Sequence, residues 1–355
     1  MHRPEGLNGS TVFFRKPHLH DLLSKSHAGA SVGTFCKIAI PFWLAMTYNL
    51  NMSIRQLAIF DLPYVYSFRD HAIGLDTART LTRGNPLGAV GLFAYVNPVR
   101  HIYSAIANSE DEPVLGGIIH SSKDTFAKLL YIAPSSQLDH PDLPELIENL
   151  SAQAGAWGAF HVLAEVDETS NAFVALRKAG FSVYAWQRMW DVSKIMEASQ
   201  SFDWMRVKSV HLPSVQNLYH QIVPPLLQPV ESQPKSPSGW MCNEGVKCYV
   251  SATHGTHGIV LAPLIHPEAT NVSEKLASLI SNLPDRRNRP VYVCVRSYQA
   301  WLEPVLADLG AQGADRQAVM VKHLVHMVKE EQTAPAVPSG VSVQPSRVSR
   351  AEGKK

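Results

Sequence analysis

The chain has 355 residues, of which 45% are hydrophobic and 17% charged, and its formal net charge is +2. This length favours two domains, and the near-neutral charge argues against a dedicated nucleic-acid surface. Four cysteines, without zinc-type pairing or disulfide density, predict a protein of the reducing cytoplasm.

The two ends of the chain differ from its body in composition. Residues 1–51 contain one apolar run, Ile38–Met46, which is interrupted by Pro41 and is too short to span a bilayer. No small-residue cleavage site of a signal peptide follows it. We therefore expect a poorly ordered extension at 1–51, a disordered tail at 330–355, and no membrane association.

Local patterns predict the elements of the first half. Asp61 stands before a Leu-Pro pair and is expected to cap a helix there, and Asp142 begins a capping box with Glu145. The expected elements are a strand at 54–60, a helix from 61, a partly helical stretch at 77–96, a meander of strands at 101–107, 113–120 and 125–133, and a helix from 142.

The most informative pattern occurs twice. Residues 160–192 predict a buried strand, an amphipathic helix ending at Gly180, and a strand rich in aromatic residues. Residues 291–310 repeat the strand and the helix, which ends at Gly310, 130 positions after Gly180. A glycine in left-handed conformation would end each helix. A repeat of this size predicts two copies of one domain in tandem.

The second half follows the same order. His211, Leu212 and Pro213 repeat the Asp-Leu-Pro phrase at 61–63. The expected elements are strands at 207–211, 247–251 and 258–265, a helix at 273–283, a strand at 290–295, a helix at 298–309 and a strand at 317–324. We therefore predict domains at 52–197 and 203–329.

Three segments carry a resemblance to a known family. They are Ile132–Pro134 at the end of the fourth strand, Val162–Val166 as the fifth strand, and the phrase Lys178–Tyr184. In this order of elements, the chain resembles the GNAT superfamily of acyl-CoA-dependent N-acyltransferases. The resemblance implies an α/β fold of two tandem GNAT-like domains, each with a mixed central β-sheet flanked by helices.

The resemblance also implies an activity for the first domain, which is transfer of an acyl group from acetyl-CoA or another acyl-CoA to a small-molecule amine by direct attack. Tyr131 and Ile132 would then hold the pantetheine arm. Ser135, Ser136 and Gln137 would replace the glycine loop on which the family binds the pyrophosphate.

Other residues depart from the family pattern. The loop at 134–142 has no glycine and carries Asp139 and Asp142, which would repel a diphosphate. The loop at 266–271 also lacks glycine, and Leu176 and Leu306 stand where the family often has a proton-donating tyrosine. The alternative is a catalytically degenerate GNAT-fold module that has lost acyl-CoA binding and interacts with an unknown protein partner. A third possibility is that the cleft between the two copies binds a small molecule.

Few other residues suggest chemistry. Glu165 and Asp167 alternate on a predicted strand and are either a general-base pair or solvated carboxylates. Tyr184 is the other catalytic candidate; with Trp186 and Trp190 it is expected on one strand face, in the core or lining a ligand pocket. His254 and His257 imply no third ligand, so no metal site is expected.

Overall fold

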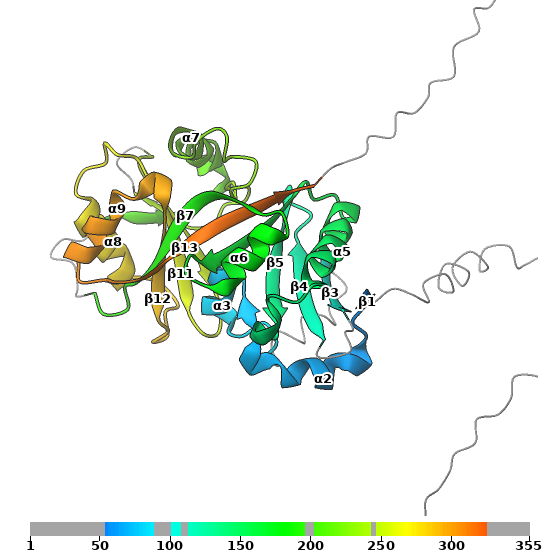
Figure 1. The fold of residues 1–355 in the computed structure, drawn as a ribbon. Coiled ribbons are helices and arrows are strands. Elements are labelled where there is room, and N and C mark those ends of the chain that lie inside the picture. The colour runs from blue at the N-terminus through cyan, green and yellow to red at the C-terminus, as the bar shows by residue number, and fades with distance from the viewer. Residues whose placement is uncertain (1–53, 89–100, 108–112, 196–201, 243–245, 325–355) are drawn as a thin grey trace, which may run out of the picture. The chain divides into compact units, whose positions relative to one another are not determined.

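The computed structural model describes residues 54–88, 101–107, 113–195, 202–242 and 246–324 (Figure 1). These residues all belong to one compact unit that spans 53–355. The predictions for 1–51 and 330–355, and the end of the stretch at 77–96, lie outside the described residues.

The first half forms a sheet with helices on both of its faces. One core lies under α5 and α6, and a second lies on the opposite face under α2. The elements are β1 (Ile54–Gln56), the 3-10 turn η1 (Ile59–Asp61), α2 (Leu62–Ser67), η2 (Arg69–His71), β2 (Ile73–Gly74), α3 (Thr77–Arg83), β3 (His101–Ala107), β4 (Val114–His120), β5 (Phe126–Ala133), η4 (Ser135–Gln137), α5 (Leu143–Ala156), β6 (His161–Asp167), α6 (Asn171–Lys178) and β7 (Ser182–Asp191).

The second half repeats these elements with the exception of η2, β2, α3 and η4, and it adds the 3-10 turn η6 before its last helix. Its core lies under α8 and α9, with a smaller cluster under α7. The elements are β8 (Trp204–Arg206), η5 (Ser209–His211), α7 (Leu212–Ile222), β9 (Trp240–Cys242), β10 (Cys248–His254), β11 (Ile259–Ile265), α8 (Val272–Ser281), β12 (Val291–Arg296), η6 (Ser297–Gln299), α9 (Leu302–Asp308) and β13 (Gln312–His323). The α/β fold with two tandem copies is therefore as the sequence predicts.

The two predicted helix caps are wrong. Asp61 and Asp142 precede helices as expected, but neither side chain accepts a capping hydrogen bond. Both residues already have helical backbone angles, with ψ of −12° and −8°, whereas a capping side chain needs an extended backbone. Asp61 instead accepts hydrogen bonds from the Ala58 amide, at 2.8 Å, and from the Arg55 guanidinium.

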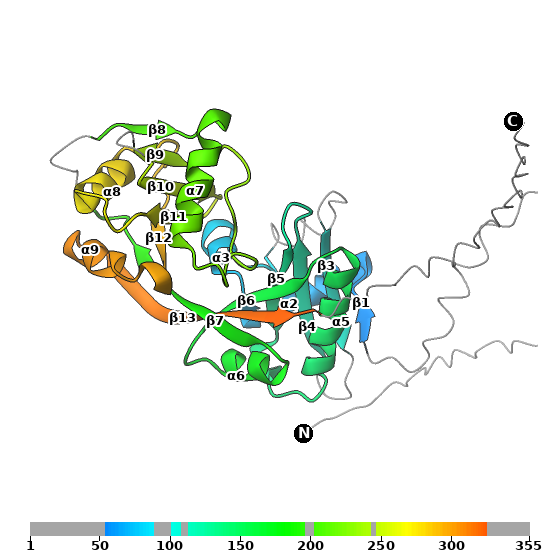
Figure 2. The same cartoon turned by 90° about the horizontal axis from the view of Figure 1, so that it is seen from above.

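One mixed sheet of 13 strands runs through both halves (Figure 2). Twelve strands follow the order β1-β3-β4-β5-β6-β13-β7-β12-β11-β10-β9-β8, and β2 pairs with β5 at one side of this path. Pairing is antiparallel except between β5 and β6 and between β11 and β12. The predicted domain limits, 52–197 and 203–329, stay a prediction, since the sheet continues across both halves.

The halves exchange their last strands. β13 ends the second half but pairs with β6 of the first, and β7 ends the first half but pairs with β12 of the second. The equivalent residues Gln187 and Gln317 face each other where β7 and β13 meet, and Gln187 Nε2 donates to Gln317 Oε1 at 2.9 Å. Each half of the sheet is therefore completed by a strand of the other.

Gly117 on β4 gives a stability prediction. A Cβ atom at this position would lie 2.3 Å from Tyr131 Cε1 and 2.9 Å from Ser104 Oγ. Gly117→Ala should lower the free energy of unfolding by about 1–3 kcal/mol in urea titrations, because the buried Tyr131 ring must move. Gly155→Ala on α5 is the control: its Cβ would approach Leu324 at 3.8 Å, and the higher helix propensity of alanine should stabilise the protein. Equal effects of the two substitutions would contradict the prediction.

Candidate functional site

The main cavity of the described residues lies where the two halves meet. It has a volume of about 370 Å³ and lies beneath α7 and the loop that follows this helix. Its walls come from β5, β6 and β7 of the first half and from β10, β11 and β12 of the second. Because the strand exchange joins β7 to β12, the cavity crosses the join between the halves.

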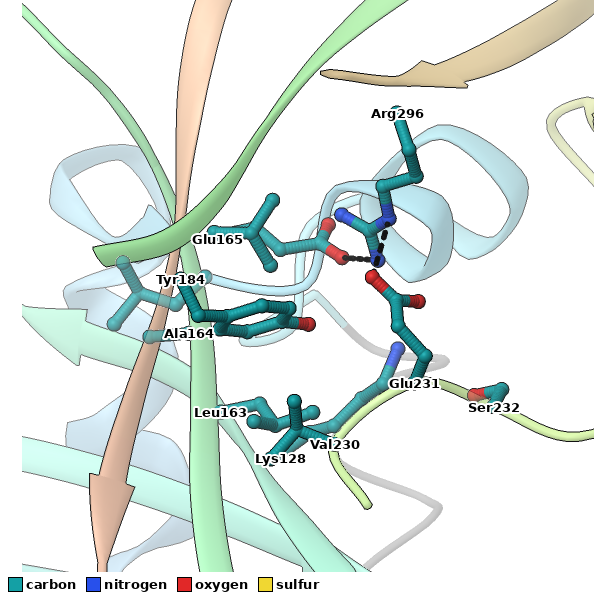
Figure 3. Close-up of a pocket in the computed structure, with 11 residues that line it drawn as sticks. Lys128, Leu163, Ala164, Glu165, Tyr184, Val230, Glu231, Ser232 and Arg296 are labelled. Atoms are coloured by element: carbon teal, nitrogen blue, oxygen red, sulfur yellow. Dashed lines mark ion pairs between the residues drawn. The ribbon is translucent and has the colours of Figure 1, made fainter. Parts of the chain in front are cut away.

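A buried charge cluster forms one side of this cavity (Figure 3). It consists of Asp76, Lys128, Glu165, Glu231 and Arg296. Arg296 Nε lies 3.2 Å from Glu231 Oε1, and Arg296 Nη2 lies 3.6 Å from Glu165 Oε1. Lys128 Nζ donates to Asp76 Oδ1 at 3.3 Å. The three carboxylates are each 9% exposed or less, so these charges interact with little screening by water.

Backbone and amide groups fix the cluster in place. The Thr77 amide, at the start of α3, donates to Glu165 Oε2 at 2.9 Å. Arg296 Nη1 donates to Gln187 Oε1, and the Gln187 amide group in turn donates to Gln317. The exchanged strands β7 and β13 therefore orient the guanidinium of Arg296.

The cluster separates the pKa values of two carboxyl groups. Burial acts to raise the pKa of Glu165, but the charges of Lys128 and Arg296 outweigh burial and leave this pKa below its ordinary value. Burial raises the pKa of Glu231, and the Arg296 charge offsets this effect only in part. Two nearby carboxyl groups with pKa values shifted in opposite directions can hold and exchange a proton.

Tyr184 faces this cluster because its strand is irregular. In β7, Ala185 pairs with Val319 and Val183 pairs with Met320, so Tyr184 is an extra residue in a β-bulge. The bulge turns Tyr184 into a small pocket that shares Glu165, Glu231 and Arg296 with the cavity, whereas Trp186 packs in the core under α6. The prediction that Tyr184, Trp186 and Trp190 share one face is therefore wrong.

The two catalytic candidates lie together in the structure. Glu165 and Tyr184 both line the small pocket at the cluster, and Figure 3 shows the Tyr184 hydroxyl pointing toward Glu231. Asp167, the predicted companion of Glu165, is exposed and accepts a hydrogen bond from Gln317 Nε2 at 3.1 Å. The carboxylates of Glu165 and Asp167 therefore have separate environments.

The five residues expected at an acyl-CoA lie elsewhere. Tyr131 and Ile132 are fully buried, and their backbone pairs with Gly74 and Ile73 of β2. Ser135, Ser136 and Gln137 form the turn η4 after β5, where the two serines are exposed, and none of the three lines the central cavity.

The gap between β5 and β6 is filled by the chain itself. These strands pair only at their beginnings, up to Lys128 and Leu163, and then diverge. Leu75 lies in the gap: its amide donates to Leu130 O at 2.9 Å, and its carbonyl accepts from the Glu165 amide at 2.8 Å. Leu75 thus bridges the diverging strands in the place where the resemblance expects pantetheine.

The equivalent gap in the second half is different. β11 and β12 pair up to Leu261 and Val293 and then diverge, and the cavity reaches Ala262 and Cys294 there. The Gln299 side chain binds β11 in this gap, where it donates to Pro263 O and accepts from the Ile265 amide, both at 2.9 Å.

Four members of the cluster escaped the sequence predictions, namely Asp76, Lys128, Glu231 and Arg296. The sequence did contain a pattern that could have indicated Arg296. Val291, Val293 and Val295 alternate as buried residues, which places the charged Arg296 on the other face of the same strand. Lys128 stands alone in an apolar strand. Glu231 lies in a loop without periodicity, and no local pattern marks it.

The described part of the chain has neither a metal-site cluster nor a membrane-spanning helix. It contains no cluster of three or more His, Cys, Asp or Glu side chains with the geometry of a metal site. None of its helices is long and apolar enough to cross a bilayer.

Solved structures resemble this fold at low sequence identity. A GCN5-related N-acetyltransferase from Sphaerobacter thermophilus has a TM-score of 0.49 and 11% identity, over 76% of this chain and 95% of its own. A putative acetyltransferase from Pyrococcus horikoshii has a TM-score of 0.46 and 14% identity, over 77% and 89%. A tandem GNAT protein from the clavulanic acid biosynthesis pathway has a TM-score of 0.45 and 15% identity, over 76% and 98%.

No protein-family model and no curated protein matches the sequence. The structure thus resembles GNAT acetyltransferases, as the sequence predicts. These identities and TM-scores say nothing of what this chain binds.

Proposed function

We propose that this GNAT-like protein binds a small molecule in its central cavity and that its first half does not use acyl-CoA. The observation that carries this proposal is the position of Leu75 between β5 and β6. The backbone groups of β5 that would hold pantetheine already have partners in β2 and Leu75, and Leu75 is 1% exposed. Binding of acyl-CoA there would require this segment to leave the sheet.

The charge at the pyrophosphate position supports the same proposal. Asp139 is exposed beside the turn η4, and Asp142 directly precedes α5. Carboxylates near a helix N-terminus compete with a diphosphate for the positive end of the helix dipole. The lone ion pair of Asp139, with Lys178 at 3.1 Å, is exposed and contributes little.

A second candidate function is acyl transfer to an amine in the second half. The observation in its favour is that the gap between β11 and β12 opens into the central cavity at Ala262 and Cys294. An amine in the cavity would lie beside Glu231, which could accept its proton. Gln299 would have to release Pro263 and Ile265 for pantetheine to bind.

Titration with acetyl-CoA separates these functions. We expect no change in melting temperature up to millimolar acetyl-CoA, whereas a site saturated a hundredfold above its Kd would add about 2.7 kcal/mol. Stabilisation that Ser136→Glu abolishes would contradict the proposal for the first half. Stabilisation that only Thr270→Glu abolishes, in the loop before α8, would favour acyl transfer in the second half.

A further inference from the structure

The buried charge cluster is short of one positive charge. It holds three carboxylates, Asp76, Glu165 and Glu231, and among the described residues their ion pairs involve two cations, Lys128 and Arg296. At the rim of the cavity Lys235 pairs with Asp124, and Lys123 is exposed, so solvent screens its charge. The excess buried charge of the cluster is therefore negative.

Two buried oxygen atoms at the cluster, Glu231 Oε1 and the Tyr184 hydroxyl, have no hydrogen bond of ordinary geometry among the described residues. Glu231 Oε1 lies 3.2 Å from Arg296 Nε, and the Tyr184 hydroxyl faces Glu231. Glu231 is itself 9% exposed. A buried polar atom without a partner is costly, so these two oxygens favour a ligand that brings donors.

An anion would find few unused donors in the same place. The guanidinium of Arg296 is shared among Glu165, Glu231 and Gln187. Lys128 donates to Asp76. A cation, in contrast, would meet unused acceptors and the rings of the tyrosines that line the cavity, Tyr219, Tyr249 and Tyr298.

We infer that the central cavity binds a small organic cation with N–H donors, an ammonium or amidinium group, which lies against Glu231 and Tyr184. The inference rests on the proposed binding function and adds the chemical class of the ligand. The group binds in its charged form, and its binding requires no acyl-CoA.

Proton exchange follows from this arrangement. Burial raises the pKa of Glu231, so this group takes up a proton more readily than an ordinary glutamate. A cation beside Glu231 lowers that pKa again, so binding should release up to about one proton and should strengthen as pH rises. The groups that face Glu231 are Lys128 on β5, Glu165 on β6, Tyr184 on β7, Tyr219 on α7, Cys294 and Arg296 on β12, and Tyr298 on η6.

The test is calorimetry with four probes of matched size: benzamidinium, benzyltrimethylammonium, benzyl alcohol and benzoate. Titrations at two pH values, in buffers of different ionisation enthalpy, measure proton release. Benzamidinium should bind at least about tenfold more tightly than benzyl alcohol and benzoate, with proton release. Benzyltrimethylammonium should bind more weakly than benzamidinium, because it has no N–H donor.

Three variants assign the effect to the cluster. Tyr184→Phe removes a hydroxyl whose contact with Glu231 lacks ordinary hydrogen-bond geometry, so it should change the melting temperature of the free protein little and weaken benzamidinium binding several-fold. Glu231→Gln should abolish proton release and weaken binding at least about tenfold. Glu268→Gln, at an exposed carboxylate outside the cavity, is the control and should change neither.

The outcomes are distinguishable. If benzyl alcohol or benzoate bound as tightly as benzamidinium, the inference that the ligand is a cation would be overturned. The proposed binding function would still hold. The absence of binding by all four probes would overturn both. Binding of benzamidinium that Glu231→Gln leaves unchanged would overturn the assignment to this cluster.

Discussion

Val319→Pro should unfold both halves of the protein in one transition. Val319 lies in the middle of β13, opposite Glu165 on β6 and Ala185 on β7, and it is 1% exposed. Proline removes an amide donor from a strand that is paired on both sides, so we expect a loss on the order of 3 kcal/mol or more. Urea titration gives the loss, and hydrogen exchange of β4 and β11 reports each half separately.

The control is the same substitution at another position of the same strand. Ala314 is exposed and falls within an irregularity of β13, where it has no partner in the pairing with β7. Ala314→Pro should therefore change stability by less than about 1 kcal/mol. If Val319→Pro left β4 in the first half protected while β11 lost protection, the exchanged strand would not hold the two halves together.

The repeat was predictable because its signals are local. The helices that end at Gly180 and Gly310 follow from apolar spacing and from a residue able to adopt positive φ, and both glycines have it, at 88° and 83°. The partners of β7 and β13 were not predictable. The two strands occupy equivalent places in the repeat, so no local pattern in the sequence indicates which of them pairs with β6.

Only those residues of the candidate site that belong to the repeated motif could be predicted from the sequence. Glu165 and Tyr184 stand out as polar groups in the repeated motif, and both line the small pocket at the charge cluster. Arg296 joins them because the strand exchange pairs it with Gln187, which is a contact between the halves. Leu75 reaches the gap between β5 and β6 through a short segment that carries no periodicity.

Arg296→Met should be the most destabilising single change in the cavity. It leaves Glu165 and Glu231 buried without their shared cation, and removal of one partner of a buried ion pair costs about 3–5 kcal/mol. Urea titration near neutral pH measures the loss. Arg188→Met on the neighbouring strand is the control: Arg188 pairs with Glu303 at 2.6 Å, but both side chains are partly exposed, so a loss of about 1 kcal/mol or less is expected.

The loss should also depend on pH in a defined direction. In the native protein the pKa of Glu165 is lowered, so its contribution is present above the ordinary pKa and is lost as pH falls through the native value. Without Arg296, both carboxyl groups lose a cation that lowers their pKa, while Lys128 remains beside them, so both pKa values rise and the variant loses stability relative to the native protein as pH rises above about 4.3, the ordinary value for glutamate. The difference in free energy of unfolding between the native protein and Arg296→Met should therefore increase from about pH 4.5 to about pH 7.5. The Arg188→Met control should not show this trend. If this difference did not change with pH, Arg296 would stabilise the protein by packing alone, and its charge would not affect the ionisation of the two carboxyl groups.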